Sequence, residues 1–197
     1  MAIWAGARLG ELTLPASGWP LFVVAVALTG CVVALWPRPG PGRWARGAAG
    51  EQATAALLAR LAPGRWFVFH DLALPGSDAN VDHLVIGPTG VWVIDTKAYR
   101  ARLQARWGRV TVGRVPLSTA AVRWEAGVVS GLLGVPVRPV IAVHGRGLPR
   151  RGRHYQSVVV LPATRLLRKL RRGRALRRRL DRRRAQELAR LAEARFG

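Results

Sequence analysis

Hydrophobic positions follow different patterns in the two parts of the chain. From Trp19 to Trp36 nearly every side chain is apolar, and Thr29 is the only one that is clearly polar. As a helix this run would be roughly 27 Å long, close to the ~30 Å hydrocarbon thickness of a bilayer. Tryptophans at both ends suit the two membrane interfaces. The pattern predicts a transmembrane helix over 19–36, preceded by a short N-terminal segment over 1–18.

The charges that flank this run set its expected orientation. Arg38, Arg43 and Arg46 follow it closely, whereas one arginine and one glutamate precede it. By the positive-inside rule, we expect a single-pass protein of the cell membrane with its C-terminal domain in the cytoplasm. A lipidated Cys31 is the alternative, because Leu28-Thr29-Gly30-Cys31 resembles a lipobox. The apolar run continues beyond the cysteine, which favours the membrane span.

After this run the pattern becomes that of a folded domain. Residues 37–46 are rich in Pro, Gly and Arg, which is typical of a linker. Strong helix formers predict a helix over 51–61, which ends at Pro63-Gly64. Short runs that favour strands then surround one more helical stretch: strands at 66–70, 81–86, 91–96 and 103–112 with a break at Gly108, a helix at 117–133, and strands at 137–143 and 157–161. This order predicts an α/β fold (α+β with a mixed sheet) over 47–163, followed by an arginine-rich helix over 164–197.

Charge is the second strong signal in the chain. It holds 32 Lys and Arg against 10 Asp and Glu, a net charge of +22 that lies entirely after residue 36. A field this positive predicts a polyanionic partner, either nucleic acid or an anionic membrane surface. Only Lys97 and Lys169 are lysines. In a chain that otherwise uses arginine, each lysine indicates a position where an ammonium is required. The single cysteine excludes an intramolecular disulfide and a zinc site built from several cysteines.

The basic residues are densest in the predicted C-terminal helix. The candidates for nucleic-acid contacts there are Arg168, Lys169, Arg171, Arg172, Arg174, Arg177 and Arg178. Such a helix can bind nucleic acid without sequence preference, with DNA favoured over RNA as the partner. It can also lie on anionic lipid beside the membrane span, or remain a solvated tail. The sequence leaves these three interpretations open.

Two carboxylates occupy matched positions in a predicted hairpin. Two alternating apolar runs flank Gly87-Pro88-Thr89-Gly90, a loop of common length and suitable composition. If the two residues that flank this loop directly pair with each other, Asp82 lies opposite Asp95, and alternation places Lys97 on the same face. Opposed side chains have Cβ atoms about 4.5–5.5 Å apart, so two carboxylates there repel unless a cation separates them. A divalent metal ion and Lys97 would both serve.

These residues and their surroundings resemble the nuclease-related domain (NERD) family, which is assigned to the PD-(D/E)xK nuclease superfamily. The resemblance rests on Gly50-Glu51 opening a helix, on the run 81–90, and on Val93-Ile94-Asp95-Thr96-Lys97. It is strong through residue 97 and looser from there to residue 165. It implies a restriction-endonuclease-like core and hydrolysis of phosphodiester bonds in nucleic acid, with Mg²⁺ or Mn²⁺ as the cofactor.

The resemblance also implies a role for each residue of the motif. Asp82 and Asp95 would ligate the metal ion together with the main-chain carbonyl of Thr96. Glu51 would approach from the helix as a further ligand or as a carboxylate that positions water. Lys97 would orient the attacking water or stabilise the charge that develops on the phosphate. Hard oxygen ligands suit Mg²⁺, and a compact ammonium suits the last role.

Three features depart from the family pattern or stand outside it. The second motif carboxylate is commonly Glu but is Asp95 here, and the glutamine expected on the helix after the third strand has no match in Val122-Arg123-Trp124-Glu125-Ala126. His83 follows Asp82 but alternation turns it to the opposite face, which indicates a packed histidine. A fold does not fix a function, so the alternative is a catalytically weak or inactive, membrane-tethered module that binds nucleic acid.

Overall fold

The computed structural model of the protein describes residues 22–28, 41–173 and 179–196. The chain divides into two units, of which the first ends at Gly40. In that first unit residues 22–28 form a helix whose side chains are all exposed. The rest of the predicted transmembrane run, with Cys31, lies outside the described residues. Within the described part of the chain, no helix is both long and apolar enough to cross a membrane.

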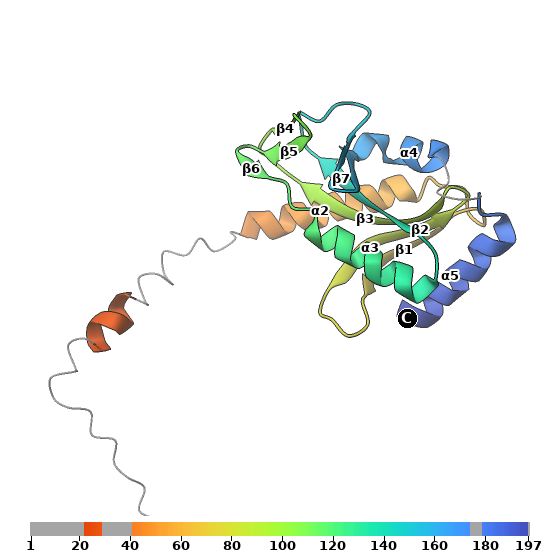
Figure 1. Cartoon of the computed structure of the whole chain (residues 1–197), viewed down its shortest axis with the longest axis horizontal. Coiled ribbons are helices and arrows are strands. Elements are labelled where there is room, and N and C mark those ends of the chain that lie inside the picture. The colour runs from red at the N-terminus through yellow and green to blue at the C-terminus, as the bar shows by residue number, and fades with distance from the viewer. Residues whose placement is uncertain (1–21, 29–40, 174–178, 197) are drawn as a thin grey trace, which may run out of the picture. The chain divides into compact units, whose positions relative to one another are not determined.

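Six strands of the second unit form one mixed sheet in the order β1-β2-β3-β7-β9-β8 (Figure 1). The antiparallel part consists of β1 (Phe67–Ala73), β2 (Asn80–Gly87) and β3 (Gly90–Ala98). The parallel part joins β3 to β7 (Val137–His144) and β7 to β9 (Val158–Pro162), and β8 (Arg153–Tyr155) closes the edge antiparallel to β9. The mixed sheet that the order of elements predicted is confirmed.

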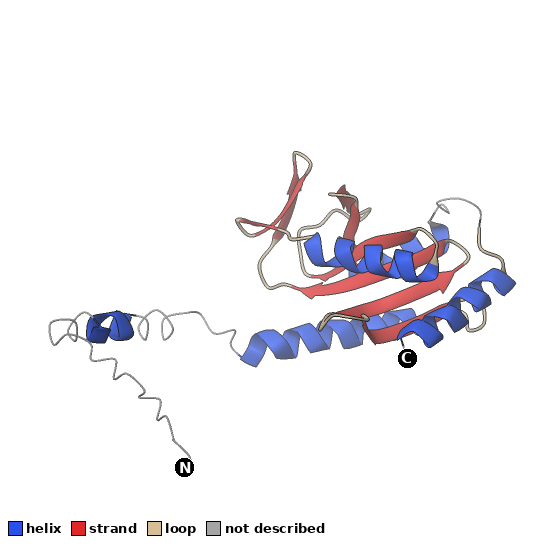
Figure 2. Cartoon of the chain, turned by 60° about the horizontal axis from the view of Figure 1, so that its bottom comes forward, coloured by secondary structure: helices blue, strands red, loops and turns tan. Residues whose placement is uncertain are grey.

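Helices cover both faces of this sheet, so each face has its own apolar core. The α-helices are α2 (Pro41–Leu58), α3 (Ala120–Leu133), α4 (Leu166–Arg172) and α5 (Arg182–Phe196). Residues of α3 and α5 pack on the face that carries Leu84 and Val93, whereas residues of α2 and α4 pack on the face that carries Trp92 and Ile94. Figure 1 shows α3 in front of the sheet with α2 behind it, and Figure 2 shows helices on both sides of the strands. Strand alternation explains the division, because neighbouring side chains point to opposite faces.

A second, smaller sheet follows β3 directly. It consists of β4 (Leu103–Arg106), β5 (Arg109–Val112) and β6 (Val115–Pro116), in that order. The break expected at Gly108 is the turn between β4 and β5, where Trp107 and Gly108 both have positive φ, 52° and 71°. Two such residues match the mirror-image turns that close tight hairpins. Trp107 is 95% exposed at this tip.

The first long helix of the domain begins earlier than the sequence predicted. It starts at Pro41, inside the stretch expected to be a Pro/Gly/Arg linker. The helix packs closely on the sheet further along, at Gly50, where an added Cβ would lie 3.2 Å from Cβ of Ala98 and 3.4 Å from Cγ2 of Thr96, whereas an added Cβ at Gly42 would meet nothing within 4 Å. Close packing on β3 therefore stabilises a helix whose glycines alone would disfavour it.

The C-terminal region forms two helices in place of the single one expected over 164–197. The first, α4, ends at Arg172, and α5 begins at Arg182. At Gly173 an added Cβ would lie 2.8 Å from the carbonyl oxygen of Lys169 and 3.0 Å from the Trp92 ring. The chain leaves the helix at this close approach, which no larger residue could make without movement.

Candidate active site

The hairpin that carries the motif has the predicted register. β2 and β3 pair from Gly87–Gly90 to His83–Ile94, with Ile86 opposite Val91. Asp82 and Asp95 lie one step beyond the last of these pairs. There the backbone N–H of Thr96 donates to Oδ2 of Asp82 at 2.7 Å, so a side chain takes the place of a strand partner. This contact fixes the Asp82 carboxylate at the end of β3.

Lys97 is the cation of this group. Its Nζ donates to Oδ1 of Asp95 at 2.6 Å. Burial lowers the pKa of Lys97, but Asp95 and Asp82 raise it by more, so the ammonium stays charged. The Lys97 side chain is 40% exposed and that of Asp95 is 8% exposed. Lys97 therefore links a buried carboxylate to the surface from which a substrate would arrive.

Burial makes the negative charges of this group unfavourable. It raises the pKa of Asp95 to about 6, although Lys97 opposes the shift. It also raises the pKa of Asp82, against the opposing effects of the Thr96 N–H and of Lys97. Asp82 and Glu51 add to the shift at Asp95 by repulsion. Negative charge thus exceeds positive charge here, and a further cation would relieve the repulsion.

Glu125 is a buried carboxylate of the same group that the sequence pattern did not identify. It lies on α3 and is 7% exposed. Burial, then Asp95 and Asp82, raise the pKa of Glu125 to about 7. The sequence held one ambiguous indication of this residue, because Glu125 shares the buried face of α3 with Val122 and Val129. An acid among such positions rarely lies in a core without a partner.

Glu51 lies beside the group but is exposed to solvent. Burial raises the pKa of Glu51, as do Asp82 and Asp71, whereas Lys97 lowers it. The next turn of α2 is tied to the sheet, because Oγ1 of Thr96 donates to Oγ1 of Thr54 at 3.1 Å. Thr54 in turn shares a 2.8 Å hydrogen bond with Nε2 of His144. These bonds hold the part of the helix that carries Glu51 against β3 and β7.

His83 packs away from the carboxylates, as alternation predicted. Its Nδ1 lies 2.8 Å from Nδ1 of His70, its partner on β1, and the side chain is 3% exposed. Burial and His70 lower the pKa of His83 to about 4. This is a neutral, packed histidine near neutral pH and does not join the candidate site.

The carboxylates provide some, but not all, of the ligands that a metal ion needs. Among the residues that the structure describes, no group of three or more Asp, Glu, His or Cys side chains is arranged to hold one. However, Mg²⁺ is usually bound by one or two carboxylates, with waters and substrate phosphates completing its shell. The oxygen donors Asp82, Asp95 and the Thr96 carbonyl are of the type that this ion prefers. Their chemistry fits Mg²⁺ or Mn²⁺.

Comparison with known proteins identifies the family of the chain. The model of the family described as nuclease-related domain, NERD, matches residues 46–162, which is more than half of the chain. The chain belongs to the NERD family. An uncharacterized protein of Bacillus anthracis, pXO1-01, is 32% identical over 89 residues, which cover 44% of this chain and 36% of that protein. The chain therefore spans little more than a third of that relative, and no solved structure matches it.

The NERD region includes every residue of the candidate site and ends with β9. The predicted nucleic-acid contacts lie beyond it, on α4 and after. Those on α4 are Arg168, Lys169, Arg171 and Arg172, while Arg174, Arg177 and Arg178 lie outside the described residues. Because α4 packs on the Trp92 face of the sheet, these cations are on the face opposite Asp95. The structure thus separates the basic helix from the carboxylates.

Proposed function

We propose that this NERD protein is a membrane-anchored nuclease whose domain faces the cytoplasm and hydrolyses phosphodiester bonds with Mg²⁺ or Mn²⁺. The supporting observation is the gathering of Asp82, Asp95 and Glu125 about one ammonium, Lys97, with burial raising the pKa of all three carboxyls. Such a group of carboxylates favours binding of a divalent cation, and phosphate oxygens commonly complete the ligands of such an ion. Nucleic acid is the substrate, with DNA favoured over RNA.

In this proposal the residues of the chain divide the work. Asp82, Asp95 and the carbonyl of Thr96 would hold the ion, and the chemistry that it would supply is a lower pKa of bound water. Lys97 stabilises the charge that develops on the phosphate oxygens, and its bond to Asp95 fixes the ammonium before substrate binds. Glu51, exposed at the side of the group, positions the attacking water.

The test is cleavage of plasmid DNA, single-stranded DNA and RNA by the full chain, with Mg²⁺, with Mn²⁺ and in EDTA. We expect metal-dependent cleavage that Asp82→Ala abolishes and that Lys97→Ala slows by about 100-fold or more. Asp78→Ala is the matched control, because Asp78 is an exposed acid outside the group and should leave the rate unchanged. Cleavage that survives both site variants would remove these residues from the proposed mechanism.

A nucleic-acid-binding module without catalysis is the second candidate function. It is favoured by one observation: Asp82 and Asp95 are already bound by the Thr96 N–H and by Lys97, at 2.7 and 2.6 Å. Titration with Mn²⁺ separates the two candidates. Binding heat that vanishes in Asp95→Ala supports the nuclease, whereas salt-dependent DNA binding with no metal uptake and no turnover supports the module.

Membrane anchoring in this proposal is supported by the apolar run 19–36 and by the arginines that follow it. Arg171, an exposed arginine of α4, then contacts nucleic acid, and contact with anionic lipid is the alternative for the same residue. Vesicle co-sedimentation of a chain lacking residues 1–40 distinguishes them. Binding to phosphatidylserine vesicles that Arg171→Gln weakens would favour lipid.

A further inference from the structure

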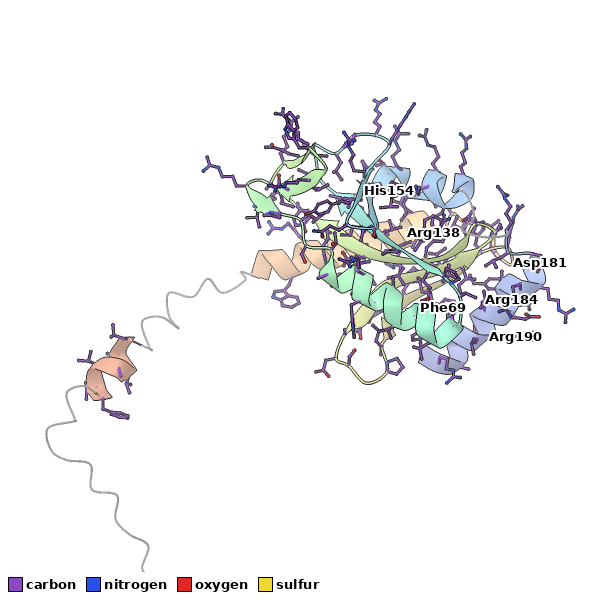
Figure 3. All side chains as sticks on the ribbon, viewed as in Figure 1. Phe69, Arg138, His154, Asp181, Arg184 and Arg190 are labelled. Atoms are coloured by element: carbon purple, nitrogen blue, oxygen red, sulfur yellow. The ribbon has the colours of Figure 1, made fainter. Side chains whose placement is uncertain are left out.

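A basic hollow of about 790 Å³ lies beside α4, at the start of β7. Its cations come from three separate segments. They are Arg138 on β7, Arg150 and Arg151 in the loop before β8, and Arg165, Arg168, Lys169 and Arg172 on α4 or directly before it. Figure 3 labels Arg138 and also His154 of β8, which lines the same hollow. None of the described residues that line it is acidic.

Strand geometry separates this hollow from the carboxylates. In the parallel ladder of β3 and β7, Arg138 pairs with Trp92, and Ile141 pairs with Asp95. Asp95 is therefore three residues further along the strand, about 10 Å at ~3.3 Å per residue, and alternation turns its side chain to the other face. A ligand in the hollow would not touch Asp95 or Lys97.

Arg138, one of the cations that line the hollow, is held in place by Trp92. The guanidinium of Arg138 lies 4.6 Å from the centre of the Trp92 ring, a cation–π contact. Trp92 is fully buried, and its Nε1 donates to Oγ1 of Thr89 at 3.2 Å. The hydroxyl of Thr89 in turn donates to the carbonyl of Leu170 on α4. Arg138 is thus presented on a rigid aromatic surface that is itself tied to α4.

Lys169 adds a second cation to the lining of the hollow. Burial lowers the pKa of Lys169, and Arg138 lowers it further by repulsion. An anion bound beside both side chains would favour their charged forms. Lys169 is also one of only two lysines among 32 basic residues, and the other, Lys97, serves the candidate active site. Both lysines therefore lie where a compact, strongly hydrated charge has a use that a guanidinium does not match.

We propose that this hollow binds a compact, multiply phosphorylated small molecule, such as a nucleoside triphosphate or inorganic tripolyphosphate. Cations from three segments match an oligophosphate, because a guanidinium group binds two phosphate oxygens at once and an ammonium adds a point charge. The volume lies within the roughly 300–1,000 Å³ usual for small-molecule sites. Buried Val159 and Leu161 also line it and give a base or ring an apolar contact.

The shape of the hollow favours a small ligand over a polymer or a bilayer. Cations that surround a depression concentrate charge at one place, whereas a nucleic-acid backbone follows an extended groove. A bilayer surface is met by exposed apolar side chains beside the charges. The exposed large apolar residues of the described chain, such as Trp107 and Trp124, line no part of this hollow.

The test is calorimetric titration of the full chain in neutral detergent with inorganic tripolyphosphate and, separately, with ATP. EDTA is present throughout, so the result does not depend on metal binding by the carboxylates. We expect both probes to bind, and Lys169→Gln and Arg168→Gln each to weaken binding at least tenfold. Arg190→Gln on α5 removes the same charge outside the hollow and should change affinity less than twofold. Because Arg168 is exposed, its variant should keep the native melting curve.

The two probes also distinguish the sources of the phosphate groups. Equal affinity indicates recognition of the phosphate chain alone, and tighter binding of ATP indicates an added contact to the base; both results support the proposal. Four results overturn it. The first two are no binding of either probe and an equal loss of affinity in Arg190→Gln. The others are displacement of the probes only by single-stranded DNA, with affinity that grows with its length, and binding seen only with phosphoinositide vesicles.

Discussion

The ammonium of Lys97 lies 2.6 Å from the carboxylate of Asp95, two residues earlier on the same face of β3. The contact joins a residue that is nearly inaccessible to one that is half-exposed. Lys97 therefore has two tasks, since it neutralises a buried charge and also presents a positive charge toward a substrate. The two tasks can be separated by substitution.

Lys97→Ala should remove both the charge that neutralises Asp95 and the charge that faces a substrate. Lys97→Arg should keep the first and impair the second. We expect Lys97→Ala to reduce the rate of DNA cleavage by about 100-fold or more, the usual effect of removing a group that stabilises developing charge. Lys97→Arg should keep the stability of the domain but remain slow, because the planar guanidinium cannot take the place of the compact ammonium. Initial cleavage rates and urea midpoints of both variants check this. Full activity in Lys97→Arg would show that any cation at this position is enough.

Asp95→Asn should make the metal-free domain more stable at high pH. Burial raises the pKa of Asp95 from 3.8 to about 6, so the folded state holds this proton more tightly than the unfolded chain does. The contribution is fully favourable below pH 3.8 and is lost as the pH rises through 6, on the order of 3 kcal/mol in all. The free energy of unfolding of the variant should therefore exceed that of the native chain at pH 8 but not at pH 4. Urea unfolding in EDTA at both pH values measures the difference, and an equal effect at both would contradict this account.

Glu125→Gln should change how Mn²⁺ affinity depends on pH. A metal ion competes with protons for carboxylates, and burial raises the pKa of Glu125 to about 7 and that of Asp95 to about 6. In the native chain, affinity should rise between pH 5.5 and 8 as both groups lose their protons. In Glu125→Gln the rise should end near pH 6.5, with weaker binding at pH 8. Calorimetry at four pH values tests this, and an unchanged profile would exclude Glu125 from the site.

Gly87→Ala should destabilise the domain strongly, although glycine is replaced by the smallest chiral residue. A Cβ at Gly87 would lie 2.1 Å from the ring of Trp66, which is itself buried. Such overpacking in a core costs about 3 kcal/mol. Gly131→Ala is the matched control, because a Cβ there meets nothing within 4 Å on α3 and should stabilise the helix by roughly 1 kcal/mol. Thermal melts of both variants measure this difference in stability. Equal melting midpoints would contradict the packing described at Trp66.

The parts of the site that depend on local pairing were predictable from the sequence. The loop between β2 and β3 and strict alternation predicted Ile86 opposite Val91, and with it the shared face of Asp82, Asp95 and Lys97. Glu125 could not be placed in this way. It reaches the group only because α3 packs across β3 and β7, and that packing is set by contacts far apart in the sequence.

The same distinction applies to the fold. Strands such as β3 and β7 are apolar runs that a local pattern identifies, and both appear close to the expected bounds. The packing of α2 on the sheet at Gly50 and the end of α4 before Gly173 depend on close approach to Ala98 and to Trp92. Helix propensity carries no information about such contacts, because tertiary packing supplies most of the stability of a short helix in a protein.

The apolar run 19–36 should hold the full chain in the membrane. If the run forms the proposed membrane span, the chain should resist extraction by salt and by alkaline carbonate but not by detergent. Paired Val24→Arg and Ala27→Arg should release it, since each arginine at the centre of a span costs about 2.5–3.5 kcal/mol for insertion. Cys31→Ser separates the span from lipidation: retention that persists in this variant supports the span, and release indicates a lipid anchor. Membrane fractionation of these variants, beside a chain lacking residues 1–40, provides the measurement.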